Sequence, residues 1–138
     1  MSEPRLESRS VLVVDDDEDI LGSFKLAMEA EGAETSGVTD GNAAVHNVLA
    51  DQPDVVILDM MLPKRSGFLV LEKIKQVQDP PLVVMVTANK GKRHMAYAET
   101  LGVDAYLVKP VALQRLIDTI VDLLAARDAA AEASSTGG

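Results

Sequence analysis

The chain has 138 residues, of which 47% are apolar and 25% charged, and its 13 Lys and Arg against 22 Asp and Glu give a formal net charge of −9. This composition is typical of one globular domain and disfavours direct binding to nucleic acid. The chain has no cysteine, which excludes a disulfide scaffold, a thiolate metal site and a cysteine nucleophile. No apolar run approaches the ~20 residues of a membrane span and no signal peptide opens the chain, so we expect a cytoplasmic protein.

The first third of the chain predicts two strands and two helices. Residues 1–9 are polar and are expected to be loose. The buried strand Val11–Val14 comes next, followed by a helix whose apolar residues recur at helical spacing and which ends at Gly32. Glu34–Val38 is more polar and is predicted to be an edge strand. Asp40 can then cap a short helix that runs through Leu49.

The rest of the chain repeats this alternation. Three further apolar runs predict strands that are buried on both faces, at Val55–Leu58, Leu82–Val86 and Ala105–Val108. Helices are predicted after each of them: one capped by Ser66, one over Lys92–Leu101, and a last one with the apolar stripe Leu113, Leu116, Ile117, Ile120 and Leu124.

Five strand–helix units in succession predict an α/β fold, with a parallel sheet between two layers of helices. Right-handed crossovers make it an open, doubly wound sheet. We expect the domain to occupy residues 10–126. Residues 127–138 are rich in Ala, Ser and Gly and are predicted to be a tail or the stub of a linker.

Polar side chains follow four of the predicted strands at the point where each strand ends. They are Asp15 and Asp16, Asp59, Thr87 and Lys109. In an open α/β sheet, ligands bind at the carboxyl ends of the strands. The sequence therefore predicts that these carboxylates, one hydroxyl and one amine share a single site.

Crowded carboxylates need a cation or protons to hold them together. At ~4 Å and an effective dielectric near 20, each pair of charges costs about 4 kcal/mol. Oxygen ligands without His or Cys favour Mg²⁺, which binds one or two carboxylates and a phosphate. Asp59 can then act as a nucleophile toward a phosphoryl group, whose oxygens would be bound by Lys109 and Thr87.

The chain resembles the receiver domains of two-component response regulators over about residues 10–124. The likeness rests on Val11-Leu12-Val13-Val14-Asp15-Asp16, Val55-Val56-Ile57-Leu58-Asp59-Met60-Met61-Leu62-Pro63, Val86-Thr87-Ala88 and Tyr106-Leu107-Val108-Lys109-Pro110. It implies a flavodoxin-like fold with five helices and strand order 2-1-3-4-5.

The resemblance also implies roles for single residues. Asp59 would accept the phosphoryl group from a histidine kinase or histidine phosphotransfer protein. Mg²⁺ would be bound by Asp15, Asp16, Asp59 and the backbone carbonyl of Met61. Thr87 and Lys109 would bind the phosphoryl oxygens, and Thr87 with Tyr106 would form the switch. The side chains two residues after Asp59 and Thr87, at Met61 and Asn89, would tune the loss of the phosphoryl group to water.

Three alternatives stay open. An aspartyl-phosphate hydrolase of the haloacid dehalogenase type would use Asp15 and Asp17, but the chain is short for that fold. A flavodoxin would need a phosphate loop of Ser, Thr and Gly where this chain has acidic residues. A pseudo-receiver would share the fold without being phosphorylated, although the residues such proteins usually lose are all present here.

The expected function is a phosphoacceptor signalling domain and not an enzyme with a separate substrate. The downstream partner is expected to be a protein, with no membrane and no direct contact with nucleic acid. Whether phosphorylation drives homodimer formation is left open, as is the isomer of the Lys109–Pro110 bond.

Overall fold

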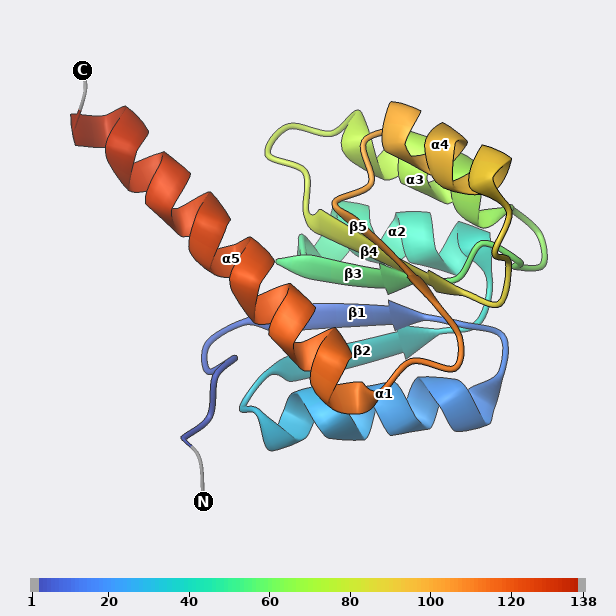
Figure 1. Cartoon of the computed structure of the whole chain (residues 1–138), viewed down its shortest axis with the longest axis horizontal. Helices are drawn as coiled ribbons and strands as arrows, with labels where there is room; N and C mark the ends of the chain where they lie inside the picture. The colour runs from blue at the N-terminus through green and yellow to red at the C-terminus, as the bar shows by residue number, and fades with distance from the viewer. Residues whose placement is uncertain (1–2, 137–138) are drawn as a thin grey trace.

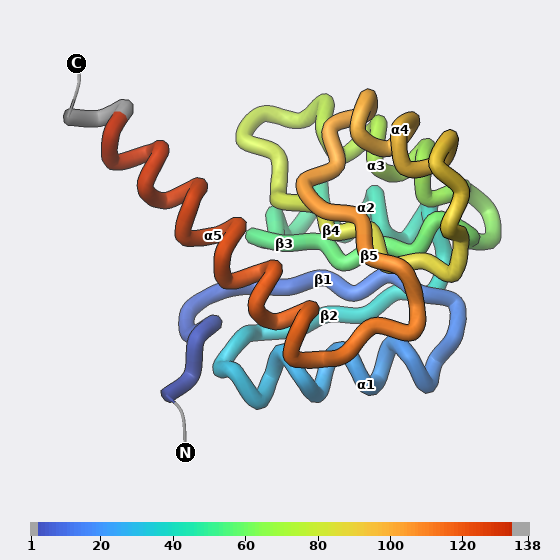
Figure 2. The backbone as a smooth tube through the Cα atoms, in the orientation of Figure 1, coloured from blue at the N-terminus to red at the C-terminus, as the bar shows by residue number. Residues whose placement is uncertain are grey.

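The structure is a computed structural model that describes residues 3–136, with side chains described up to residue 133. Strands and helices alternate along these residues (Figures 1 and 2). The strands are β1 (Ser10–Val14), β2 (Glu34–Val38), β3 (Val55–Leu58), β4 (Leu82–Thr87) and β5 (Ala105–Val108). The helices are α1 (Glu18–Ala30), α2 (Gly41–Asp51), α3 (Gly67–Lys75), α4 (Lys92–Thr100) and α5 (Leu113–Thr136).

The strands form one parallel sheet in the order β2-β1-β3-β4-β5, which confirms the predicted flavodoxin-like fold. β2 lies at an edge, as its polar sequence predicts. β2 is added on one side of β1, whereas β3, β4 and β5 are added one after another on its other side. The carboxyl ends of β1 and β3 therefore lie side by side at the switch point, where ligands bind in such sheets.

The alternation of side chains along each strand divides the core between the two faces of the sheet. Val11 and Val13 of β1 pack with α1 and α5 on one face, together with the predicted stripe of α5. Leu12 and Val14 pack with α2, α3 and α4 on the other face. Figure 1 shows these three helices together on one side of the sheet. The central strands β1, β3 and β4 are covered on both sides, so their ends are the part that reaches solvent. The prediction that Ala105–Val108 is buried on both faces is wrong: β5 is the second edge of the sheet, and of its residues only Leu107 is buried.

Side chains cap three of the helices. The carboxylate of Asp40 accepts a hydrogen bond from the Ala43 N–H at 2.8 Å, and the Ser66 hydroxyl accepts one from Leu69 at 3.4 Å, as the sequence predicts. Asp17 caps α1 in the same way. α4 begins after Gly91, which has no side chain to offer as a cap.

Within the described residues, both terminal segments are more ordered than their sequences suggest; residues 1–2 of the expected loose start and 137–138 of the expected tail lie outside the described part. Residues 1–9 are expected to be loose, but Leu6 is only 1% exposed, Arg5 pairs with Asp118 at 2.7 Å and Arg9 pairs with Asp128. α5 continues to Thr136, through residues expected to form a tail or a linker stub. Alanine has the highest helix propensity, which explains the longer helix. The domain boundaries themselves stay a prediction.

None of the helices within residues 3–136 is both long enough and apolar enough to cross a membrane.

Candidate functional site

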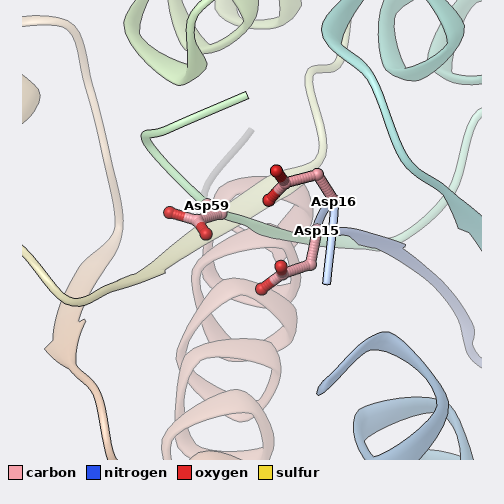
Figure 3. A group of neighbouring side chains, drawn as sticks. All are labelled: Asp15, Asp16 and Asp59. Atoms are coloured by element: carbon pink, nitrogen blue, oxygen red, sulfur yellow. The ribbon is translucent and has the colours of Figure 1, made fainter. Parts of the chain in front are cut away.

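Three carboxylates come together where β1 and β3 end (Figure 3). Asp15 and Asp16 follow β1, Asp59 follows β3, and one oxygen of each lies within 4.8 Å of the others. Val14 pairs with Leu58 in the sheet, which places the next residue of each strand at the same level. Asp15 and Asp59 are 2% and 7% exposed, whereas Asp16 is exposed to solvent.

Lys109 joins the two buried carboxylates. It follows β5, and its Nζ donates hydrogen bonds to Asp15 Oδ2 at 2.7 Å and to Asp59 Oδ2 at 2.9 Å. Its backbone N–H donates to the Thr87 carbonyl at 2.8 Å, which fixes the start of its loop against β4. The Lys109–Pro110 peptide bond is cis.

The cluster carries a net negative charge. Three carboxylates and one ammonium leave two formal negative charges, which is the charge that a divalent cation would neutralise.

Burial and pairing shift the protonation equilibria of this cluster in opposite ways. Burial raises the pKa of Asp15, although hydrogen bonds from Lys109 and from the Asp17 N–H oppose this effect. Burial alone would lower the pKa of Lys109, but its hydrogen bonds to Asp15 and Asp59 outweigh burial and raise that pKa. The ammonium is therefore held in its charged form beside the two carboxylates.

The loop after β3 closes tightly around Asp59. The Met61 N–H donates to Asp59 Oδ1 at 3.1 Å, and the Gly67 N–H donates to the Met60 carbonyl at 2.8 Å. A Cβ at Gly67 would lie 2.5 Å from Met60 Cα and even closer to the Asp59 carbonyl oxygen. Only glycine fits there, because backbone atoms cannot move aside. The side chain of Met61 points outward and is 67% exposed.

Thr87 and Tyr106 lie on the neighbouring strands. Thr87 ends β4 and is fully buried, and its hydroxyl accepts a long hydrogen bond of 3.4 Å from the Asn89 N–H. The Tyr106 hydroxyl donates to the Asn89 carbonyl at 2.8 Å. Burial, with a smaller contribution from the charge of Asp59, raises the pKa of Tyr106. Both predicted switch residues thus contact the same residue of the β4–α4 loop.

The structure brings the predicted residues to one edge of the sheet, but not all into contact. Asp15, Asp59 and Lys109 are joined by hydrogen bonds, and Asp16 belongs to the same carboxylate cluster. Two features were missed by sequence reasoning: the steric need for Gly67, and the three hydrogen bonds of Asn89. The spacing Asn89-Lys90-Gly91 before a helix is typical of an Asx turn and could have indicated the second.

Comparison with known proteins agrees with this geometry. The family model described as response regulator receiver domain matches residues 11–121. The chain belongs to this family. It is 33% identical over 130 residues to the transcriptional regulatory protein PrrA of Mycobacterium leprae, an alignment that covers 94% of this chain and 56% of PrrA. The chain thus spans about half the length of this curated relative.

Solved receiver domains have the same fold. A CheY-like response regulator receiver domain protein from Methanospirillum hungatei superposes with a TM-score of 0.84 at 28% identity, covering 87% of this chain and 96% of that one. The receiver domain of Francisella response regulator 1452 gives a TM-score of 0.80 at 28% identity, covering 88% and 99%. This chain is therefore a receiver domain, a signalling domain of two-component systems.

Proposed function

We propose that this receiver domain accepts a phosphoryl group onto Asp59, in a Mg²⁺-dependent reaction, from the phosphohistidine of a histidine kinase or a histidine phosphotransfer protein. One observation carries the proposal: the Asp59 carboxylate lies within 4.8 Å of Asp15 and Asp16 and receives a hydrogen bond from Lys109. The domain is thereby a phosphoacceptor, and not an enzyme that turns over a separate substrate.

The donor set suits Mg²⁺. We assign the metal to Asp15, Asp16, Asp59 and the backbone carbonyl of Met61, all of which are hard oxygen ligands. The two formal negative charges left by three carboxylates and Lys109 match a divalent cation. When bound, Mg²⁺ would supply positive charge to the phosphoryl oxygens and so allow an anionic donor to approach Asp59.

The transfer itself is a substitution at phosphorus. An oxygen of the Asp59 carboxylate forms the new P–O bond while the P–N bond of the phosphohistidine breaks. The imidazole leaves with the electron pair of that bond and takes a proton from solvent. Lys109 lies 2.9 Å from Asp59 and would pair with one phosphoryl oxygen, and the Thr87 hydroxyl would donate to another.

The donor needs an accessible surface beside Asp59. A hollow of about 560 Å³ lies next to Lys109 and is lined mainly by apolar atoms, among them those of Ile20, Phe24, Pro110 and Leu113; Asp19 also lines it. We place the helix that carries the phosphohistidine in this hollow, because a helix seated there would present its side chains to the end of β5 and to Lys109.

After phosphorylation, Thr87 moves toward the phosphoryl group and Tyr106 moves with it, which changes the surface of the domain and passes the signal on. In this proposal a protein partner, or a second phosphorylated copy of the chain, recognises the changed surface. The net charge of −9 argues against DNA as a direct ligand of this domain. A cytoplasmic location remains part of the same proposal.

The test is the intact mass after incubation with acetyl phosphate and Mg²⁺, for wild type and Asp59→Asn. A gain of one phosphoryl group that requires Mg²⁺ and is absent in Asp59→Asn would support the proposal. If neither acetyl phosphate nor a phosphohistidine donor adds mass while calorimetry shows Mg²⁺ binding, the chain is a pseudo-receiver. Sedimentation of the same samples tests phosphorylation-dependent dimer formation.

A further inference from the structure

Asn89 is the point at which three parts of the site meet. Its N–H donates to the Thr87 hydroxyl at 3.4 Å, its carbonyl accepts from the Tyr106 hydroxyl at 2.8 Å, and its side-chain Oδ1 accepts from the Gly91 N–H at 2.8 Å. The last bond closes an Asx turn that leads into α4. One residue thus contacts the end of β4, the ring on β5 and the start of α4.

The start of α4 depends on this side chain. Gly91 precedes the first helical residue and offers no side-chain cap, so the amide oxygen of Asn89 is the side-chain acceptor that fixes the entry into the helix. A Cβ at Gly91 would lie 2.8 Å from His94 Nδ1 and 3.0 Å from Asn89 Oδ1, so the side chains of Asn89 and His94 both lie close to this glycine.

The first turns of α4 contact α3 through aromatic rings. The His94 ring stacks on Phe68 with centroids 5.9 Å apart, and Tyr97 meets the same ring edge-on at 5.0 Å. A movement of the first turns of α4 would therefore also change these ring contacts with α3.

We propose that Asn89 is a positioning residue that couples the Thr87–Tyr106 pair to the start of α4 through its side-chain bond to Gly91. This inference rests on the proposed function, in which Thr87 moves toward a phosphoryl group. When Thr87 moves, the backbone of Asn89 moves with it, which shifts the acceptor of Tyr106 and the first turn of α4 together. The side-chain oxygen is engaged with Gly91, so in this chain it holds the loop and does not orient water at Asp59.

The first experiment needs no phosphoryl group. Hydrogen exchange of the peptide that spans residues 88–97 is measured in wild type, Asn89→Ala and Asn89→Asp. We expect exchange at Gly91 at least several times faster in Asn89→Ala, and near-wild-type exchange in Asn89→Asp, whose carboxylate can accept the same bond. Asn42→Ala, at an exposed position in α2, is the matched control. Equal exchange in wild type and Asn89→Ala would overturn the inference.

The second experiment tests coupling. The protein is labelled with 3-fluorotyrosine, the Tyr106 signal is assigned with Tyr97→Phe, and the fluorine spectrum is recorded with Mg²⁺ before and after beryllofluoride. We expect the shift of the Tyr106 signal seen in wild type and Asn89→Asp to be at least halved in Asn89→Ala. An unchanged shift in Asn89→Ala, with only phosphoryl loss altered, would overturn the inference. If wild type binds no beryllofluoride, the proposed function fails, and the exchange experiment still decides the role of Asn89.

Discussion

Lys109 donates a hydrogen bond of 2.9 Å to the carboxylate of Asp59, the residue we propose as phosphoacceptor. The same ammonium is bound to Asp15 at 2.7 Å, and the side chain of Lys109 is only 16% exposed. Both carboxylates are buried, so the bridge is a partly desolvated ion pair whose loss leaves uncompensated charge. One cation thus holds the two buried carboxylates together and, in the proposed function, also binds the incoming phosphoryl group.

Substitution of Lys109 by Met should separate these two roles. Removing one partner of a buried ion pair typically costs about 3 kcal/mol or more, so we expect the free energy of unfolding in metal-free buffer to fall by about that amount. Mg²⁺ should restore more stability to Lys109→Met than to wild type, because it replaces the lost charge. Urea unfolding with and without Mg²⁺ measures both effects. An exposed control, Lys92→Met, should change stability by less than about 0.5 kcal/mol.

Asp15 gives the site a defined pH dependence. Its folded-state pKa is raised by burial, so it favours folding when protonated, and this contribution is lost as the pH rises through the folded-state pKa. In metal-free buffer, Asp15→Asn should therefore be more stable than wild type at pH 7, by on the order of 1 kcal/mol, and the difference should shrink toward pH 4.

Urea unfolding at several pH values measures this difference. If Asp15→Asn is more stable than wild type by the same amount at every pH between 4 and 7, the titration of Asp15 is not the cause of the difference. The same variant should bind Mg²⁺ more weakly by calorimetry, because it lacks one of the proposed ligands.

Met61 should set the lifetime of the phosphorylated state. Its side chain is 67% exposed beside Asp59, and it is apolar, so it cannot orient an attacking water molecule. We expect Met61→Asn and Met61→Glu to lose the phosphoryl group several times faster than wild type, below the ~100-fold of a well-placed general base. Loss of the phosphoryl mass over time gives the rates. Met61→Leu is the control, and equal rates in all four proteins would contradict the prediction.

Gly67 and Gly22 offer a matched pair of Gly→Ala substitutions. At Gly67 the new Cβ would lie 2.5 Å from Met60 Cα, so we expect Gly67→Ala to lower the free energy of unfolding by about 3 kcal/mol, at the upper end of overpacking costs. At Gly22, within α1, a Cβ meets nothing within 4 Å. Gly22→Ala should therefore stabilise the protein by about 0.5–1 kcal/mol through helix propensity. Thermal or urea unfolding of both variants checks the contrast.

The proposed phosphorylation site should also be disturbed in Gly67→Ala, because the Cβ would push against the backbone of Asp59. We expect its Mg²⁺ affinity to fall together with its stability, whereas Gly22→Ala should bind Mg²⁺ as wild type does. A Gly67→Ala protein with normal stability and normal Mg²⁺ affinity would show that the loop can open without cost.

The sequence by itself determined the fold and the identity of the carboxylate cluster. Runs such as Val55–Leu58 are short, apolar at every position and rich in β-branched residues, which is typical of strands covered on both faces. The Asp and Lys residues that follow such parallel strands then share one edge of the sheet. The strands Glu34–Val38, Val55–Leu58 and Ala105–Val108 have the predicted bounds. The caps at Asp40 and Ser66 were predictable because capping depends on residues only three positions apart.

Only the tertiary structure decided features that depend on contacts between distant segments. The order of residues 3–9 rests on Leu6, which is buried against α1 and α5, and on pairs such as Arg5 with Asp118, more than a hundred residues away. The bonds from Tyr106 to Asn89 and from Lys109 to Asp15 join separate strands and loops in the same way. Local pattern carries no information on such pairs, because their geometry is set by how the helices and strands pack.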